Sequence, residues 1–416
     1  MVLRAASGAF LATLFAGAVL AAGRPAAFPI PDSFPVATGV RLGGDRNDTR
    51  FVMDLTKKID LHAFTLADPY RVVVDVPEVL FRLPPQVGES GHGLIKAFRF
   101  GLMMEGGSRI VLDVVKPVRV AKAFVMGAAD GDPARLVLDL VPTDRASFLR
   151  AIAAEDKLLI SAPPPLPAEA QAQAKSTDTR PLVVLDPGHG GIDSGAVAPT
   201  GQMEKVIVLD FAKRLRARIL KYGKYRVMMT RTTDVYVPLD ERVRMARRAG
   251  AALFVSIHAD SLPLNEGDAR GATVYTLSNK ASDAEAAQLA VQDNSSDVVA
   301  GINMKSQPDD VADILIDLAQ RETKRFSVQF ARDVVGDLKG VARLHKDPIK
   351  SAGFRVLTAP DVPSVLVELG YVSDPKDLRL LMSDAWRDRT ADSIATAINA
   401  YFTNHPAAAE ARADAN

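Results

Sequence analysis

The apolar residues of this chain follow two different periodicities on either side of a segment rich in alanine and proline. Residues 30–142 alternate apolar and polar side chains and favour β-branched types, which is typical of strands. From Pro181 onward, short apolar runs alternate with stretches whose apolar residues recur every three or four positions, which indicates strands alternating with helices. The pattern predicts a small all-β, sandwich-like domain followed by a three-layer α/β domain with a mixed sheet.

The segments outside these two patterns mark the expected domain limits. Residues 143–180 contain the run Ala-Pro-Pro-Pro-Leu-Pro followed by an alanine-rich stretch, and their composition indicates a linker. The α/β domain is expected to span 181–403. Residues 404–416 are rich in alanine and are expected to be a disordered tail.

The all-β region contains a weak internal repeat. Arg50–Leu55 resembles Arg109–Val114, and Arg71–Pro77 resembles Arg135–Pro142. Each copy therefore contributes two short strands in which an arginine and an aspartate flank apolar residues. Two copies of such a unit predict two sheets packed face to face.

Charge and cysteine content exclude several classes of function. The chain has 51 Lys and Arg residues against 50 Asp and Glu residues, so no global basic field is available to recruit nucleic acid. It has no cysteine, which excludes disulfides, thiolate metal sites and a cysteine nucleophile. A metal bound to this chain must therefore use histidine, aspartate or glutamate.

The first residues have the pattern of an export signal. Arg4 precedes an apolar run that begins at Ala9, and small residues near Ala21 offer a cleavage point. We interpret residues 1–22 as a signal peptide that is removed, which leaves no stable membrane insertion. The alternative is an uncleaved anchor, although the run is short for a membrane span.

Three apolar strands of the α/β region end in a residue that is capable of chemistry. The first runs into a glycine-rich turn that contains His189, the second ends at His258, and the third ends at Glu368. Functional sites in open α/β sheets gather at the carboxyl ends of strands. If these strands run alike, the three side chains share one edge, and the helix that opens near Glu204 starts at the same edge.

Two histidines and a carboxylate with an open fourth position form a catalytic zinc arrangement. A second carboxylate is then needed to move protons. Spacing alone leaves open which of Glu204 and Glu368 is the ligand and which is the proton shuttle. It also leaves open that the strand-end histidines are ordinary polar residues, or that His345 competes as a ligand.

The motifs around these residues resemble those of a known enzyme family. Val184–Ala196, with the sequence VLDPGHGGIDSGA, resembles the first motif of the zinc-dependent N-acetylmuramoyl-L-alanine amidases. Glu204-Lys205, Phe254–Asp260 and Pro363–Ser373 are similar to the family's Glu-Lys pair, second histidine motif and glutamate motif. The resemblance covers residues 181–402 in the family's order. Further matching positions are Thr230, Arg231, Asp234, Leu239 and Arg242.

The resemblance implies one zinc ion per chain held by His189, Glu204 and His258, with Glu368 as catalytic acid and base. It implies hydrolysis of the amide between N-acetylmuramic acid and L-alanine in peptidoglycan. A zinc peptidase that cuts within the stem peptide is the enzymatic alternative, and a non-catalytic wall-binding scaffold is the other. Asp193 is interpreted either as a residue that orients a ligand or as a simple turn aspartate.

The all-β region resembles the targeting (AMIN-like) domain of Gram-negative periplasmic amidases. That resemblance implies a periplasmic protein enriched at the division septum, where it splits the cell wall between daughter cells. Peptidoglycan is the expected substrate.

A long insert interrupts the α/β pattern after the strand expected over residues 272–277. About 75 residues separate that strand from Gly353, which is more than a plain crossover needs. Ser282–Glu285 has the sequence of a capping box that opens a helix. Pro308 is expected to open another helix. A four-residue spacing predicts a core helix that includes Phe326, Phe330, Val334 and Leu338.

In the family that the chain resembles, a helix in this region plugs the zinc cleft until an activator with a degenerate LytM-type domain moves it. The resemblance therefore implies a regulatory insert at about 280–322, with Asp293 near the position where relatives often carry a glutamate. The alternative is ordinary core packing. The expected activator face consists of Val311, Ile314, Leu315 and Leu318.

Overall fold

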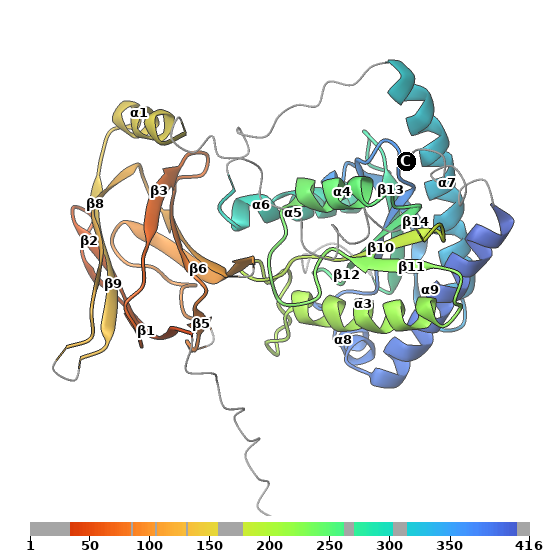
Figure 1. Cartoon of the computed structure of the whole chain (residues 1–416), viewed down its shortest axis with the longest axis horizontal. Coiled ribbons are helices and arrows are strands. Elements are labelled where there is room, and N and C mark those ends of the chain that lie inside the picture. Colours follow the sequence, from red (N-terminus) through yellow and green to blue (C-terminus); the bar gives the residue numbers. More distant parts are fainter. Residues whose placement is uncertain are drawn as a thin grey trace, which may run out of the picture. The chain divides into compact units, whose positions relative to one another are not determined.

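The computed structural model in Figure 1 describes residues 34–84, 86–104, 106–129, 132–156, 178–261, 270–302 and 314–405. The expected signal peptide, most of the expected tail and Val311 lie outside these residues. Within the described residues, no helix combines the length and apolar character that a membrane crossing requires.

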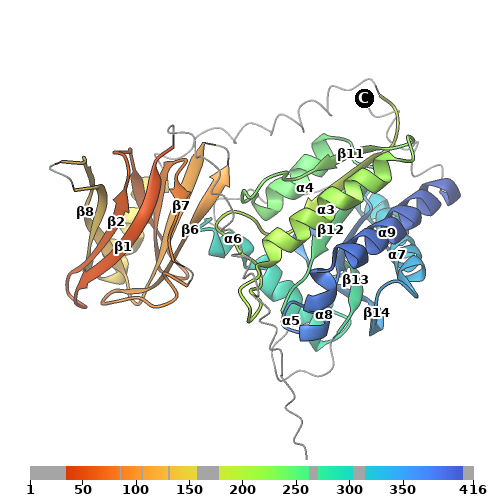
Figure 2. The ribbon, with the colours of Figure 1, turned by 90° about the horizontal axis from the view of Figure 1, so that it is seen from below.

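The N-terminal region forms two sheets, as the alternation of apolar residues predicts (Figure 2), and their strand pairs are antiparallel except for the short parallel pair of β1 with β5. One sheet has the strand order β5-β1-β2-β9-β8 and the other has the order β3-β4-β7-β6. Their bounds are β1 Val36–Gly44, β2 Thr49–Leu55, β3 His62–Leu66, β4 Arg71–Pro77, β5 Leu80–Phe81, β6 Ile95–Met104, β7 Gly107–Val114, β8 Val118–Met126 and β9 Ala134–Pro142.

The two copies of the repeat exchange strands rather than forming one sheet each. β2 of the first copy pairs with β9 of the second, and β4 of the first pairs with β7 of the second. This register places the repeated arginines opposite the repeated aspartates. Arg50 Nε lies 2.6 Å from Asp139 Oδ1, and Arg109 Nε lies 2.6 Å from Asp75 Oδ1.

A helix occupies part of the segment that composition marks as a linker. α1 (Arg145–Asp156) begins three residues after β9 and buries Phe148 edge-on against the ring of Tyr70, with ring centroids 5.3 Å apart. Residues 145–156 of the segment expected to be a linker over 143–180 are therefore helical. Residues 157–177 of that segment lie outside the described part.

The C-terminal region is built on one six-stranded mixed sheet with the order β11-β10-β12-β15-β13-β14. The four strands from β11 to β15 are parallel, whereas β13 runs antiparallel to β15. The bounds are β10 Leu182–Pro187, β11 Arg226–Met229, β12 Leu253–His258, β13 Ala272–Leu277, β14 Leu344–Ala352 and β15 Ser364–Glu368. The sheet and its helices confirm the predicted three-layer α/β class.

Helices cover both faces of this sheet (Figures 1 and 2). One face packs against α3 (Glu204–Leu220), α7 (Ile314–Leu338), α8 (Pro375–Leu381) and α9 (Asp384–Asn404). The other face packs against α4 (Leu239–Arg248), α5 (Ala284–Asn294) and the 3-10 turn η2 (Arg355–Leu357). The short helix α6 (Ser296–Val299) follows α5 directly. Because β10 and β12 are covered on both sides, they are apolar almost throughout.

The described part of the insert forms α5, α6 and the start of α7, and the helix start expected at Pro308 lies outside the described residues. α5 is capped by Asp283, whose side chain accepts a hydrogen bond from Ala286 N, so the helix starts within the expected capping box. The expected core helix is confirmed by the burial of Phe330 and Val334, but it continues N-terminally to Ile314 as one helix. Ile314, Leu315 and Leu318 therefore lie on the first turns of α7.

We expect Phe211→Ala to lower the free energy of unfolding of the C-terminal domain by about 3–5 kcal/mol. Phe211 is fully buried in the α3 layer, so truncation leaves a cavity. The matched control is Val206→Ala on the same helix, where 57% exposure of Val206 predicts a change within about 0.5 kcal/mol. Urea denaturation followed by circular dichroism measures both, and equal losses would contradict the assigned core.

Candidate metal centre

His189 is held in a strained turn by two buried arginines. It follows β10 and has a φ of 57°, a left-handed conformation that is unusual for a non-glycine residue. Arg231 Nη2 donates to Gly188 O at 2.7 Å, and Arg242 Nη2 donates to His189 O at 2.8 Å. Arg231 and Arg242 both also donate to Pro187 O. The turn is therefore fixed through three consecutive carbonyl groups.

The register between β12 and β15 brings His258 next to Glu368. His258 ends β12 and Glu368 ends β15, and the two residues are direct partners across the parallel pair. Glu204 is the first residue of α3 and is fully buried. The shared sheet edge that the sequence predicts is therefore present.

The carboxylate of Glu204 lies between the two imidazoles. Its Oε2 is 3.2 Å from His189 Nε2, and its Oε1 is 3.2 Å from His258 Nδ1. The backbone N–H groups of Ala196 and Ala259 donate to the same two oxygens at 2.9 and 2.8 Å. These bonds fix the orientation of the carboxylate, so both histidine nitrogens point toward one place.

Several buried polar atoms at this place have no hydrogen-bond partner within the described residues. They include His189 Nε2, His258 Nδ1, Asp260 Oδ2 and Glu368 Oε1. Buried polar atoms are normally paired, so a cluster of unpaired nitrogens and carboxylate oxygens needs another partner. One ligand atom from each of His189, Glu204, His258 and Asp260 lies within 4.8 Å of the others. This donor set suits a divalent cation.

The electrostatics of the cluster favour positive charge. Burial lowers the pKa of His189, but Glu204 and Asp193 outweigh it and raise that pKa well above its ordinary value. For His258, burial is likewise outweighed, chiefly by Asp293, and the pKa rises to about 9. Surroundings that stabilise a charged imidazole also stabilise a cation bound to a neutral imidazole.

Asp193 orients the imidazole of His189 through the ring nitrogen that faces away from Glu204. Its Oδ2 lies 2.8 Å from His189 Nδ1, and its Oδ1 accepts a hydrogen bond from Gly195 N at 3.0 Å. A carboxylate on one ring nitrogen fixes the tautomer that leaves the other nitrogen free for a metal. Asp193 therefore does more than close a turn.

Glu368 differs from Glu204 in its surroundings. Its Oε2 accepts a hydrogen bond from Asp260 N at 3.1 Å, whereas its Oε1 finds no hydrogen-bond partner in the part of the chain that the structure describes. Burial, with Glu204 and Asp293 nearby, raises the pKa of Glu368 to about 8, although His258 opposes this shift. A carboxyl group with a raised pKa near neutral pH is suited to accept and return a proton.

The remaining histidines lie elsewhere. In the N-terminal region, His62 on β3 and His92 in the loop before β6 are exposed. His345 is buried, contrary to its exposed-looking sequence context, and its Nε2 lies 3.6 Å from Glu285 Oε2. It is in neither group of metal-ligating side chains found among the described residues.

Sequence reasoning missed three further residues of the site. Asp260 stands two positions after His258, and its burial raises its pKa well above the ordinary value. Gln292 Nε2 donates to Asp260 Oδ1 at 2.7 Å, and Ser296 Oγ donates to Asp193 Oδ2. The motif position of Asp260 could have signalled its role, but nothing in the local sequence points Gln292 or Ser296 at the site.

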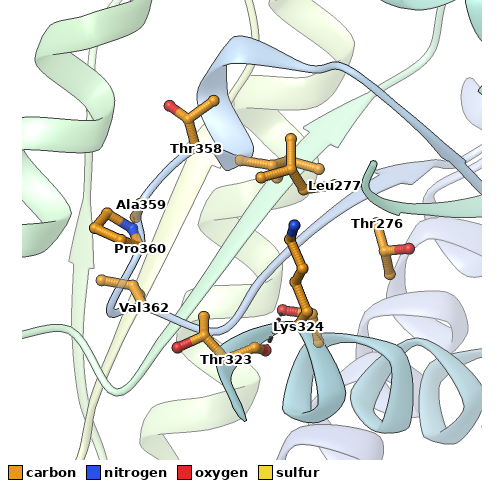
Figure 3. A pocket seen from close by; sticks show the side chains of 10 residues that line it. Thr276, Leu277, Thr323, Lys324, Thr358, Ala359, Pro360 and Val362 are labelled. Carbon is orange, nitrogen blue, oxygen red and sulfur yellow. Dashed lines mark hydrogen bonds between the residues drawn. The ribbon is translucent and has the colours of Figure 1, made fainter. Parts of the chain in front are cut away.

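A small cavity lies apart from the cluster around His189, Glu204 and His258 (Figure 3). It has a volume of about 20 Å³, which is room for about one water molecule, and it lies beside α7 and η2. Its lining includes Thr276, Thr323 and Lys324 but no histidine, aspartate or glutamate. It therefore offers no competing metal centre.

Comparison with known proteins identifies the family. The family described as N-acetylmuramoyl-L-alanine amidase matches residues 183–400, and the AMIN domain family matches residues 39–140. The chain is 35% identical to the N-acetylmuramoyl-L-alanine amidase AmiC of Escherichia coli O6:H1 over 376 residues, which cover 88% of this chain and 89% of that relative. It is 34% identical over 386 residues to AmiC of Neisseria meningitidis serogroup B, with 88% and 90% covered.

AmiA of Salmonella typhimurium is 40% identical over 229 residues, which cover 55% of this chain and 78% of that relative. The family matches and the two full-length similarities agree with the geometry of the centre. The chain belongs to the N-acetylmuramoyl-L-alanine amidase family.

Proposed function

We propose that this amidase works with one zinc ion held by His189, Glu204 and His258, and that Glu368 is its catalytic acid and base. The observation that carries the proposal is the convergence of two unpaired imidazole nitrogens on a buried carboxylate. The contacts also favour one answer to the choice that spacing left open. Glu204 lies between both histidines, whereas Glu368 lies beside His258 and its Oε1 has no hydrogen-bond partner among the described residues.

Bound zinc would supply a Lewis acid for the scissile carbonyl and lower the pKa of a water molecule. Glu368 then takes the proton of the attacking water at Oε1 and returns it to the leaving nitrogen. Asp260 N holds the other oxygen, Oε2, so the carboxyl keeps its orientation through both transfers. Asp193 keeps His189 in the tautomer that presents Nε2.

The substrate is peptidoglycan, and the cut bond joins N-acetylmuramic acid to L-alanine. We assign the enzyme to the periplasm, reached through the signal peptide over 1–22, and to septal wall splitting between daughter cells. The AMIN domain match over 39–140 supports a wall-targeting role for the N-terminal sheets. The alternative is a zinc peptidase that cuts within the stem peptide. Analysis of the reaction products distinguishes the two activities.

The enzyme is proposed to be autoinhibited by residues 284–299, here called the inhibitory segment, which comprises α5, Ser295 and α6. Asp293 on α5 is 5% exposed, and its Oδ1 lies 3.6 Å from His258 Nδ1. Both carboxylate oxygens of Asp293 lack a hydrogen-bond partner among the described residues. The cavity at the two histidines measures only about 10 Å³ and is lined in part by Asp293 and Ser296, so it leaves no room for a glycopeptide.

An activator must therefore displace the inhibitory segment before substrate enters. The family resemblance points to a protein with a degenerate LytM-type domain. Its expected contact is the start of α7, where Ile314, Leu315 and Leu318 lie within the insert of about 280–322. Val311, the fourth residue of the expected activator face, lies outside the described residues.

We expect His189→Ala to lose both bound zinc and sacculus hydrolysis, because it removes a ligand nitrogen. Glu368→Gln should keep most zinc and lose at least about 100-fold in activity, because it removes only the proton carrier. Zinc content by atomic absorption and dye release from labelled sacculi measure the two properties. Mass spectrometry of products should show intact stem peptides freed from glycan, and cuts within the peptide would instead establish a peptidase.

We expect Asp193→Asn to weaken zinc affinity by about 10- to 100-fold, since it removes the charge that orients His189. Competition with a chelating dye at pH 7 measures the affinity. Asp392→Asn is the matched control, because the exposed Asp392 side chain forms a surface ion pair with Arg218. Equal zinc affinities for the two variants would contradict the role given to Asp193.

We expect Asp293→Ala to raise basal sacculus hydrolysis without activator by about five- to thirty-fold, because the segment loses its contact with the metal centre. Val291→Ala on the same helix is the control, since Val291 is 71% exposed. Zinc content should stay at one per chain in both variants. A folded, zinc-loaded Asp293→Ala enzyme with unchanged basal activity would count against autoinhibition.

A further inference from the structure

Asp297, in α6 of the inhibitory segment, is a fully buried carboxylate whose partners come from other elements. Its Oδ1 accepts hydrogen bonds from Tyr236 Oη at 2.8 Å and from Leu239 N at 3.0 Å. Its Oδ2 lies 3.3 Å from Arg355 Nη1. A buried carboxylate is costly unless it is paired in this way, so the contacts hold α6 where it is.

One of these partners is the open end of another helix. Leu239 is the first residue of α4, and the preceding Pro238 provides no side-chain cap. The first amides of a helix have no acceptor within the helix, and its N-terminus favours negative charge. Asp297 therefore supplies, from the inhibitory segment, the capping carboxylate that the sequence of α4 lacks.

The same helix reaches the metal-ligand turn. Arg242, one turn beyond Leu239, is 1% exposed and donates to His189 O at 2.8 Å and to Asp186 Oδ1 at 2.8 Å. The first turn of α4 thus receives Asp297 at its start and holds the His189 turn at its end. The first turn of α4 therefore connects the inhibitory segment to the backbone of His189, a proposed metal ligand.

Arg355 completes the anchor from η2. Its Nη2 lies 2.6 Å from Asp240 Oδ1, in the first turn of α4, while its Nη1 faces Asp297. The backbone N–H of Arg355 also donates a hydrogen bond to Asn294 Oδ1 of the inhibitory segment at 2.9 Å. One guanidinium group therefore joins the inhibitory segment, α4 and η2.

We propose that Asp297 is the anchor of the closed state: it holds the inhibitory segment in place by capping α4, and displacement of the segment uncaps that helix. The inference rests on the proposed autoinhibition and adds a second point of attachment, separate from Asp293 and from the metal. Release of the segment accordingly changes the first turn of α4, which carries the arginine that holds the His189 turn.

The test uses the zinc-loaded full-length enzyme with Asp297→Asn, which keeps the side-chain shape but removes its charge. Basal sacculus hydrolysis should rise about five- to thirty-fold, the effect of weakening one capping contact in a two-state equilibrium. Amide hydrogen exchange should become faster in residues 284–299 and at the start of α4. Asp392→Asn, a surface substitution, should change neither reading.

The outcomes separate this inference from the function on which it rests. If Asp293→Ala raises basal hydrolysis but folded Asp297→Asn does not, autoinhibition stands and the anchor role of Asp297 is overturned. If neither variant raises it, autoinhibition itself falls. Faster exchange confined to the segment, with no change in α4, overturns the capping role.

A milder variant keeps the test decisive if Asp297→Asn fails to fold. Tyr236→Phe removes one donor to Asp297 Oδ1 and leaves the buried ring in place. It should raise basal hydrolysis about two- to five-fold and speed exchange in the segment, in keeping with the loss of one hydrogen bond. Unchanged exchange and activity in this variant overturn the proposal.

Discussion

The ion pair between Asp186 and Arg242 is the interaction on which the candidate metal centre depends. Asp186 is fully buried, and its carboxylate accepts hydrogen bonds from Arg242, Thr230 and Ser256. Burial alone would raise the pKa of Asp186, but these partners hold it below the ordinary value. A buried charge pair repays its desolvation only when its remaining atoms are satisfied, and here they are. The pair joins β10, β12 and α4 at the point where the chain turns into His189.

Repetition plays a comparable organising role in the N-terminal domain. The arginine and aspartate of each repeat do not pair with each other but with their counterparts in the other copy, as Arg50 does with Asp139 and Arg109 with Asp75. Each sheet therefore needs strands from both copies. The repeat can be recognised in the sequence. Which sheet each strand joins cannot be predicted from it, because the pairing depends on contacts between residues that are far apart along the chain.

Most of the centre could be predicted because its residues are strand ends and helix starts, and local patterns reveal those. His189, His258 and Glu368 each follow an apolar run, and Glu204 opens an amphipathic helix. Spacing could not predict which glutamate is the metal ligand and which carries the proton, since this depends on which carboxylate lies between the imidazoles. The resemblance to the amidase motifs suggested the assignment, and the contacts of Glu204 favour it.

Other features could not be predicted because they depend on tertiary contacts between segments with unremarkable local sequence. Residues 145–156 follow a strand and precede a proline-rich run, so their composition suggests a linker, yet Phe148 finds an aromatic partner in Tyr70. Gln292 and Ser296 belong to the inhibitory segment, and only the fold turns them toward Asp260 and Asp193. Helix propensity predicts that a segment is helical, but it does not predict which side of the helix faces the site.

The charge balance of the closed centre has a consequence for regulation. Asp293 adds a carboxylate to a place that already contains Glu204, Asp260 and Glu368 around two imidazoles, and like charges at this burial repel strongly unless a cation or a proton offsets them. A divalent ion in the centre would offset that repulsion, so under the proposed autoinhibition the bound ion and the closed inhibitory segment would stabilise each other. Linkage of this kind is reciprocal: whatever removes the segment also weakens the hold on the ion by the same factor. His189 needs a support in the open state that does not pass through the inhibitory segment, and Arg231, which lies outside α4 and donates to Gly188 O, provides one.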